Sequence, residues 1–480
     1  MRIAWRVVSV RTPAAQIHDT PEEPAQPRPQ RSAWLVRSSQ YSWSTIGRYA
    51  EFTYVVVALA ALTQGPVLTL WTRQTQPGQL SSDYAILSTY LAVQMPALAL
   101  LARRGLPGRG RAVVVAGIVV LVGWLSLSTV WSTVHIDTAT AVVALVATTC
   151  FGLYLAVSYS SLELVTLIVI GMQAGLLVSG WSVARHWQGS RDPIGNWVGI
   201  FFNRNSLGPP AVIASAGVVV LVAVLVSRRP PLWWCGVAVL LAVGAFDLRL
   251  QLHGDSATSW MVLAVFVGSW TLWQIAGIIA RRVRDDGRIR SARTFGIGYF
   301  CVVSVVTVTA LVERNRVSAW LGRPPEFDGR GLHWSANWAG VQDRPFFGWG
   351  WLAAWHTPEF RVRLSPEIAN DIWSHSAYFD LLLGGGVVAA GIFVAIVVAA
   401  FAGLADMALR VPLIGALPVA LATAILVANT QESFIIGNHF LWALLVAALC
   451  AQPWAANGRS VPIIDVSLTP DTAPTSKDEQ

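Results

Sequence analysis

The feature that most limits how this chain can fold is a series of long apolar runs. The hydrocarbon core of a bilayer is about 30 Å thick, and about 20 helical residues cross it. Only 12% of the 480 residues are charged, whereas soluble domains carry about 25%. We therefore predict an all-α integral membrane protein with about 12 transmembrane helices. They are expected near 49–71, 83–102, 112–130, 138–158, 161–181, 207–227, 232–248, 257–280, 294–312, 378–404, 411–429 and 433–451.

Polar segments flank and interrupt these runs. Residues 1–48 are rich in Pro and Arg and lack the continuous apolar stretch of a cleaved signal peptide, so a disordered cytoplasmic tail is expected there. Residues 453–480 are expected to form a second disordered cytoplasmic tail, which leaves 49–452 as the membrane domain. The longest interior break, 313–374, is expected to be a large extracytoplasmic loop between spans 9 and 10.

The distribution of basic residues predicts the orientation. With both termini inside, the inner segments carry 22 basic residues and the outer segments carry 12, of which seven lie in 313–374. Cytoplasmic loops of membrane proteins are enriched in Lys and Arg. The prediction is therefore a multi-pass protein of the cell inner (cytoplasmic) membrane with both termini cytoplasmic. This bias accounts for the net charge of +8, which does not indicate nucleic-acid binding.

The outer arginines are concentrated rather than scattered. Ten of the 12 lie in two segments, 182–206 and 313–374. The planar guanidinium group binds phosphate and carboxylate through two parallel hydrogen bonds, so the concentration suggests an anionic ligand such as a lipid pyrophosphate. The alternative is contact with lipid headgroups, or ion pairs with neighbouring carboxylates. Those carboxylates are Glu313, Asp328, Asp343 and Glu359.

One polar motif stands at the edge of an apolar run. Asn203, Arg204 and Asn205 precede the sixth run, where polar side chains are costly unless they line a cavity. The alternative there is helix capping by Asn205 or Ser206.

In the long loop, Arg330 begins a segment in which Trp334, Trp338 and Val341 recur at helical spacing. This spacing predicts a short amphipathic helix that lies on the outer leaflet or over the mouth of the bundle. Its tryptophans either stack on sugar rings or anchor the helix at the headgroups.

A histidine follows at the start of the tenth run. Ser374 is expected to cap that helix, with His375 in its first turn. The positive end of the helix dipole disfavours imidazolium, and a neutral imidazole can act as a general base. The alternative is a structural histidine. Glu432, at the outer end of the last two runs, is expected either to orient an arginine or to lie in water.

Cysteines give no sign of a metal site or a disulfide framework. Cys150, Cys235, Cys301 and Cys450 all lie inside apolar runs without metal-type spacing, so they are interpreted as small apolar residues. No cofactor is predicted.

Several motifs follow one another in a fixed order along 50–452. They are WLSLSTVWS, GIFFNRNSLG, HGDSATSW, DGRGLHW, RPFFGWGW, SHSAYFDLLLGGGVVAAGIF and ANTQESFIIGNHFLW. Together and in this order, they resemble the O-antigen ligase/polymerase superfamily of membrane glycosyltransferases. One position departs from that pattern, because the family often has His-Asn where this chain has His375-Ser376.

The resemblance implies metal-independent transfer of an oligosaccharide or polysaccharide from an undecaprenyl-pyrophosphate donor to an acceptor hydroxyl. The partners would be a lipid-linked glycan donor, a glycan or lipid acceptor, and membrane lipids. By position, Arg330 and Arg204 would contact the pyrophosphate, and His375 would act as or near the base. We predict His375 and Arg330 as catalytic residues. The predicted substrate-binding residues are Arg204, Asn205, Arg191, Trp334 and Glu432.

The main alternative is a polytopic transporter or flippase of a lipid-linked or anionic substrate. Such proteins usually contain internal repeats and polar sites near the bilayer midplane, neither of which is evident in this sequence. A second class of membrane glycosyltransferase carries an acidic pair in its first outer loop, but 72–82 holds no carboxylate. A non-catalytic scaffold and a glycan polymerase of the shape, elongation and division type also remain open.

Overall fold

The computed structural model describes residues 33–71, 84–282, 288–313, 316, 330–369 and 373–452. Within these ranges the chain is helical, and its extended pairing is limited to one bridge between Arg191 and Trp197. The expected tails 1–48 and 453–480 lie largely or wholly outside the described residues. The chain divides into two units, Met1–Glu51 and Phe52–Gln480. The first contains the beginning of α1 (Ala33–Leu62), and the second contains every element considered below.

Nine helices in the described part of the chain are long and apolar enough to cross a membrane. Each coincides with a run predicted from the sequence, so the all-helical fold is confirmed for the described residues, and these nine helices are candidate membrane spans by length and composition. They are α3 (Tyr84–Arg104), α4 (Ala112–Leu127, extended by short 3-10 turns to Arg109–Val130), α5 (His135–Ser158), α6 (Ser161–Ala184), α7 (Arg204–Arg228), α8 (Trp233–Gly254), α9 (Ala257–Arg282), α10 (Arg288–Val312) and α14 (Ala377–Arg410).

The other three predicted spans are interrupted, so the expectation of 12 spans is not confirmed. The first run breaks at Gln64, whose φ of 74° ends α1 before α2 (Gly65–Trp71). The eleventh divides into α15 (Pro412–Gly415) and α16 (Leu417–Ala428), and the twelfth retains only α17 (Phe440–Leu449). At 1.5 Å per residue, α16 and α17 are about 18 and 15 Å long, well short of a bilayer core.

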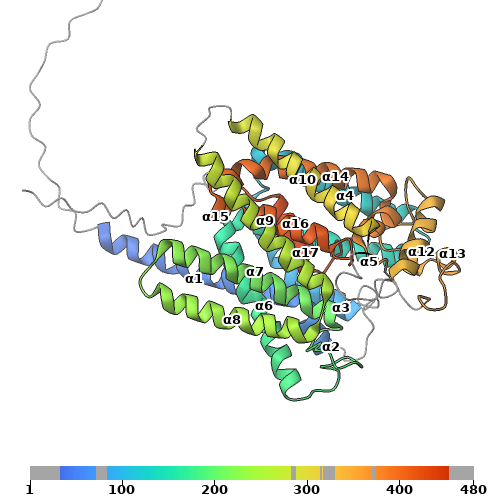
Figure 1. Ribbon diagram of the computed structural model, residues 1–480, viewed down its shortest axis with the longest axis horizontal. Coiled ribbons are helices and arrows are strands. Elements are labelled where there is room, and N and C mark those ends of the chain that lie inside the picture. Colours follow the sequence, from blue (N-terminus) through green and yellow to red (C-terminus); the bar gives the residue numbers. More distant parts are fainter. Residues whose placement is uncertain are drawn as a thin grey trace, which may run out of the picture. The chain divides into compact units, whose positions relative to one another are not determined.

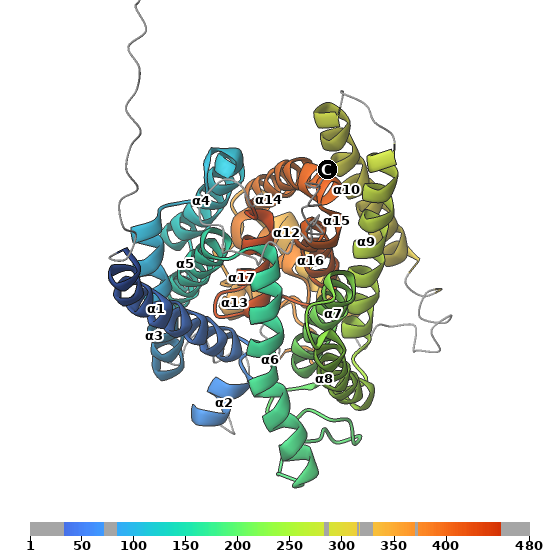
Figure 2. The ribbon, with the colours of Figure 1, turned by 90° about the vertical axis from the view of Figure 1, so that its left-hand side faces the viewer.

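These two short helices occupy the interior of the larger unit. Every residue of α16 and α17 is buried, and Figure 2 shows both surrounded by longer helices. Since they are too short to reach across a membrane, the non-helical 429–439 segment between them lies within the protein. Irregular backbone at membrane depth is tolerated where protein encloses it or where it lines a cavity. The fold therefore supplies an interior polar segment.

The polar stretch between α10 and α14 contains α12 (Arg330–Asp343), a 3-10 turn (Ala354–His356) and α13 (Pro358–Arg361). Figure 1 shows α12 and α13 together at one end of the helices. The predicted helix beginning at Arg330 is confirmed, and Trp338 on it is 54% exposed. The buried face of the helix includes Ala336 and Val341, which belong to a separate apolar cluster together with Leu383 of α14. The cluster comprises Ala336, Val341, Trp349, Ala354, Trp355, Phe360, Ile368 and Leu383.

A kink in α14 receives the segment after α12. Gly386 has a φ of 67° and a ψ of −167°, and a Cβ there would overlap the Phe346 carbonyl. The Val387 amide donates to Pro345 O at 2.8 Å, and the Trp349 amide donates to Leu383 O at 2.6 Å. Glycine allows this approach because it has no Cβ and tolerates positive φ. The kink fixes the polar stretch against the start of α14.

Candidate functional site

A cavity of about 170 Å³ opens at the ends of several helices of the larger unit. Its walls come from the starts of α3, α5, α7 and α14 and from the 429–439 segment. The lining residues are Gln64, Tyr90, Ala141, Ala144, Phe202, Asn203, Asn205, Ser206, Leu352, His356, Trp373, His375, Asp380, Glu432, Ser433, Phe434, Ile436, Gly437, Asn438 and His439. Such a mixture of apolar and convergent polar side chains is typical of a binding site.

The 429–439 segment is held by its own polar groups. Asn429 closes the end of α16, because its side chain donates to Ile425 O at 2.7 Å and accepts from the Phe434 amide at 2.9 Å. The Ala377 amide, at the start of α14, contacts the carbonyls of Asn429 and Glu432 at 3.0 and 3.2 Å. These bonds satisfy backbone groups that have no helical partner. They also set the Glu432 side chain beside the start of α14.

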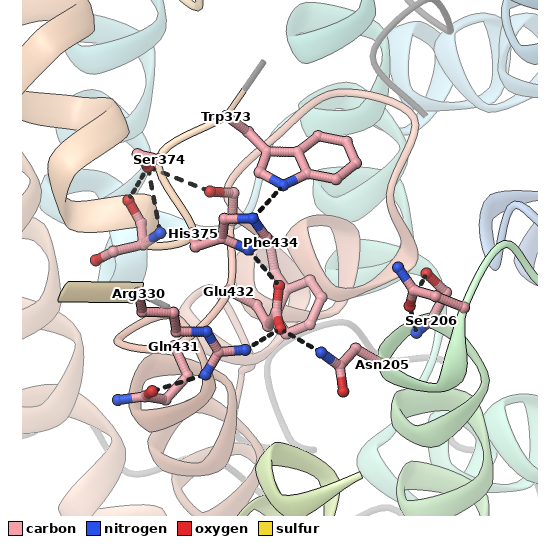
Figure 3. Close-up of polar contacts among 12 residues, drawn as sticks. Asn205, Ser206, Arg330, Trp373, Ser374, His375, Gln431, Glu432 and Phe434 are labelled. Atoms are coloured by element: carbon pink, nitrogen blue, oxygen red, sulfur yellow. Dashed lines mark hydrogen bonds and ion pairs between the residues drawn. The ribbon is translucent and has the colours of Figure 1, made fainter. Parts of the chain in front are cut away.

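Glu432 is the centre of the polar network (Figure 3). Its Oε1 accepts from Arg330 Nη2 at 2.5 Å and from Asn205 Nδ2 at 3.0 Å. Its Oε2 lies 3.6 Å from His375 Nδ1. A second nitrogen of Arg330, Nη1, donates to Gln431 Oε1 at 2.8 Å. Glu432 therefore orients an arginine, as expected. Three other predicted site residues, Arg330, Asn205 and His375, face its carboxylate.

His375 has a strained backbone and a defined ring orientation. Its φ of 52° is unusual for a residue other than glycine, and such outliers persist where the surroundings over-determine them. Nε2 accepts a hydrogen bond from Trp373 Nε1 at 2.8 Å. Because Nε2 is the acceptor, the neutral ring carries its proton on Nδ1, which faces Glu432. The His333 ring packs edge-on against it, with centroids 4.7 Å apart.

Ser374 does not cap α14 as predicted, and His375 precedes the helix rather than lying in its first turn. The residue before Ala377 is Ser376, which makes no side-chain cap bond. Ser374 Oγ instead donates to Asp380 Oδ1 at 2.6 Å and accepts from the Ser376 amide at 3.2 Å. The Ser374 carbonyl accepts from Asn337 Nδ2 at 3.0 Å. The loop before α14 is thus fixed by a buried Ser–Asp pair and by α12.

The start of α7 is capped by Asn203, not by Asn205 or Ser206. Asn203 Oδ1 accepts from the Ser206 amide at 2.8 Å. Asn205 is thereby left to face the cavity, where it joins Glu432, and its Oδ1 accepts from Ser256 Oγ at 3.0 Å. Arg204 is half-buried at the first position of this helix, between two residues that line the cavity.

Two other predicted binding residues lie elsewhere. Arg191 is exposed and lies over the Trp197 ring, with its Cζ 6.0 Å from the ring centroid. Arg249 approaches the same ring at 5.8 Å, and His253 stacks on it at 4.0 Å. Trp334 is half-buried on α12. Among the described residues, the lining of the cavity includes neither Arg191 nor Trp334. It also lacks Arg204 and Arg330, although Arg330 contacts Glu432, which does line it.

Several remaining arginines contact neighbouring carboxylates or aromatic rings rather than the cavity. Arg316 pairs with Glu313 at 2.8 Å, and Arg363 pairs with Asp343. Arg344 lies 4.1 Å above the Trp349 ring. Arg314, Arg323 and the predicted partner Asp328 fall outside the described residues. Concentration in one segment therefore does not by itself identify an arginine that faces the cavity.

His356 and Asp380 were not predicted as site residues, although both line the cavity. Burial lowers the pKa of His356, the nearby Asp137 partly offsets this effect, and Arg361 adds to it. The imidazole therefore stays neutral at pH 7. Asp380 is 3% exposed. Its position in the first turn of α14, six residues after Ser374, was the available sequence signal.

Trp373 and Gln431 were also missed. Each lies next to a predicted residue in the sequence, but its contact depends on backbone conformations that composition does not reveal. In the described part of the chain, no group of three or more His, Cys, Asp or Glu side chains could hold a metal ion. The four cysteines are free.

Models of known protein families and curated proteins gave no match to this chain. The resemblance drawn from the motifs therefore remains a prediction.

Proposed function

We propose that the protein is a membrane glycosyltransferase that moves an oligosaccharide or polysaccharide from an undecaprenyl-pyrophosphate donor to an acceptor hydroxyl. The observation that carries this proposal is the contact of both His375 and Arg330 with Glu432, from segments far apart in the sequence, beside a cavity that His375 and Glu432 line. The reaction needs a group that accepts a proton and groups that stabilise a leaving phosphate. His375 in the cavity wall is the candidate for the first, and Arg330, bound to Glu432, is a candidate for the second.

His375 suits the role of general base. The Trp373 N–H bound at Nε2 sets the tautomer with its proton on Nδ1, and that nitrogen lies 3.6 Å from the Glu432 carboxylate, too far for a hydrogen bond. The imidazolium formed by proton transfer to Nε2 would be stabilised by the same carboxylate. A carboxylate beside an imidazole stabilises the imidazolium in other enzymes that activate hydroxyl groups.

Arg330 and the start of α7 suit the pyrophosphate. Arg330 uses two of its N–H groups on Gln431 and Glu432, and a guanidinium offers about five in all. The N-terminus of α7 adds backbone N–H groups and the positive end of a helix dipole beside Arg204 and Asn205. Fixed donors of this kind stabilise the charge that grows on a leaving oxygen.

The proposed step is a direct displacement at the anomeric carbon of the donor sugar. The acceptor oxygen forms a bond to that carbon, the bond from the carbon to the phosphate oxygen breaks, and its electron pair leaves with the pyrophosphate. The acceptor proton moves to Nε2 of His375. Atoms and charge balance without an added co-reactant.

We place this reaction at the outer face of a bacterial cytoplasmic membrane. The positive-inside bias supports an orientation in which the start of α7 and the 313–374 stretch are extracytoplasmic. The cavity gathers at the helix ends that share this side. In this proposal, both termini are cytoplasmic, about 12 apolar segments form the membrane domain, and the product belongs to cell-surface glycan synthesis.

Transport of a lipid-linked or anionic substrate is the second candidate. Interrupted helices such as α14 at Gly386 and the pair α16 and α17 are features that transporters use around their binding sites. The cavity, however, is built at helix ends, whereas transporter sites lie near the midplane. Uptake of lipid-linked glycan analogues or anionic solutes into liposomes would support transport instead.

The deciding experiment is genetic complementation in the native host. Deletion of the gene should cause a lipid-linked glycan to accumulate in the membrane, and the wild-type gene should remove it. His375→Ala and Arg330→Ala should fail to do so while reaching the membrane in normal amounts. Extracted lipid-linked glycans, measured by mass spectrometry, provide the readout.

Matched controls come from the same end of the molecule. Arg363→Ala removes an ion-paired arginine of the same polar stretch, and His135→Ala removes a histidine at the start of α5. Both should complement fully. If the His375→Ala variant and the Arg330→Ala variant each complemented the deletion, the site assignment would be wrong. If the deletion strain did not accumulate lipid-linked glycan, the proposed function would be contradicted.

A further inference from the structure

The proton-accepting nitrogen of His375 is already occupied by a neighbouring side chain. Trp373 Nε1 donates to His375 Nε2 at 2.8 Å, and the two rings are nearly perpendicular at 88°. Both side chains line the cavity, and Figure 3 shows the indole nitrogen directed at the imidazole. Nε2 offers one lone pair in the plane of the ring. It therefore cannot take a proton from a hydroxyl while the indole holds it.

The other ring nitrogen is not available for this role. Nδ1 carries the proton, is buried and faces Glu432, and the His333 ring packs against the imidazole with the two ring centroids 4.7 Å apart. A hydroxyl group that is to reach Nε2 must therefore replace the indole N–H. The indole nitrogen thus marks where that hydroxyl would bind.

We infer that Trp373 forms the acceptor subsite, and that it takes a sugar whose hydroxyl replaces the indole N–H on His375. This inference rests on the proposed glycosyl transfer. The displaced indole presents its face to the sugar ring, and its N–H becomes available to a ring or hydroxyl oxygen. Tryptophan has this combination of a broad apolar face and a polar edge. The acceptor thus regains contacts that offset the bond it displaces.

Water makes the same exchange less favourably than a sugar, because it has no apolar face for the indole to cover. Trp373 therefore disfavours water at the base relative to a sugar. If water did reach Nε2, its oxygen would attack the anomeric carbon, its proton would pass to His375, and the pyrophosphate would leave. The product would be a free reducing glycan instead of a new glycosidic bond. Trp373 thus determines the choice between transfer and hydrolysis.

The test measures both products in one reaction. Purified full-length protein is added to detergent-solubilised membranes of the deletion strain, which supply the native lipid-linked glycan and its acceptor. Transferred glycan and free reducing glycan are quantified separately. Trp373→Phe keeps an aromatic face and removes the N–H, so the hydrolysed share should rise about fivefold, the effect of one neutral hydrogen bond.

Trp373→Ala removes the aromatic face as well as the N–H. The ratio of glycan transferred to donor consumed should therefore be about tenfold lower than in the wild type. Trp338→Phe is the matched control, because Trp338 is an exposed tryptophan of α12 that lies outside the cavity lining. It should leave the ratio of the two products unchanged. The elution profile and the melting temperature establish whether each variant is folded. If Trp373→Ala is not folded, the result of Trp373→Phe decides the test.

A ratio of products equal to the wild-type ratio in the Phe variant, or in both variants, would overturn the inference while leaving glycosyl transfer intact. Failure of the wild-type protein to consume any lipid-linked glycan would instead contradict the proposed function. A parallel fall of transfer and hydrolysis in both variants would make Trp373 a structural support of His375 and would also overturn the inference.

Discussion

Two arginine–carboxylate pairs of the same polar stretch differ in their surroundings. Arg330 and Glu432 are each 13% exposed, and the carboxylate also holds Asn205 and faces His375. Arg363 and Asp343 are 35% and 37% exposed, and both belong to the stretch between α10 and α14. The first pair joins α12 to the interior 429–439 segment, whereas the second fastens a loop locally over Trp349.

The difference shows that position decides what an ion pair can do. Charges that share an enclosed site interact through a low effective dielectric and are hardly screened, so losing one leaves its partner in an unfavourable setting. Exposed pairs are weakened by water and salt and contribute at most about 1 kcal/mol. Of the two pairs, only the enclosed one includes a residue that lines the cavity, Glu432.

The largest contrast is expected when each carboxylate is neutralised. Glu432→Gln removes the group that faces His375 and leaves Arg330 without its counter-charge, so transfer should fall at least about 100-fold. The free energy of unfolding should fall by about 3 kcal/mol. Transfer by purified protein and melting in detergent measure the two effects.

Asp343→Asn is the control for that experiment. Its transfer rate should stay near the wild-type rate, and its stability should change by less than about 1 kcal/mol. Equal losses in the two variants would remove the distinction between the pairs. A folded Glu432→Gln variant with normal transfer would exclude Glu432 from the reaction.

Much of this arrangement could be predicted from the sequence, because polar residues are conspicuous in an apolar chain. Glu432, His375 and Asn205 were each noted as polar side chains at the end of an apolar run, whereas Arg330 was noted in the long polar stretch and received its role from the family resemblance. Asn205, Arg330 and His375 all face the Glu432 carboxylate. Their meeting could not be predicted, since it brings together residues from four distant segments. Arg191 had the same signal, yet it packs on Trp197.

The last two apolar runs were misjudged for a physical reason. A helix surrounded by protein and a helix surrounded by lipid are both apolar on all sides, so hydropathy does not separate them. The lengths of α16 and α17 therefore became visible only in the structure. Likewise, the contact between Trp373 and His375 depends on a φ of 52° at His375, which residue type does not indicate.

Burial in the cavity wall also predicts a pH dependence of stability. Burial lowers the pKa of His356 in the cavity wall from its ordinary 6.5. As the pH falls below 6.5, His356 takes up a proton in the unfolded chain, whereas in the folded protein it does so only at a lower pH. The free energy of unfolding therefore falls as the pH falls. Well above pH 6.5, His356 is neutral in both states and does not change the free energy of unfolding. His356→Gln should reduce the loss of melting temperature between pH 7 and pH 5.

An acid-induced loss of the same size in His356→Gln and in the wild type would contradict this assignment. Asp343→Asn serves as the comparison, because it changes a charge in the exposed pair and leaves His356 in place. Its acid-induced loss should match that of the wild type.

The smallest effect concerns salt. Arg363→Ala removes the exposed pair, and its destabilisation at low ionic strength should be under about 1 kcal/mol. At 1 M salt the screening length is about 3 Å, so most of that difference from the wild type should vanish. Arg330→Ala should keep most of its destabilisation, because few ions reach a pair that is 13% exposed. Melting temperatures of the three proteins at low and high salt measure this. If salt removed both differences equally, the Arg330–Glu432 pair would be as open to solvent as the Arg363–Asp343 pair, and the enclosure on which the site depends would be absent in solution.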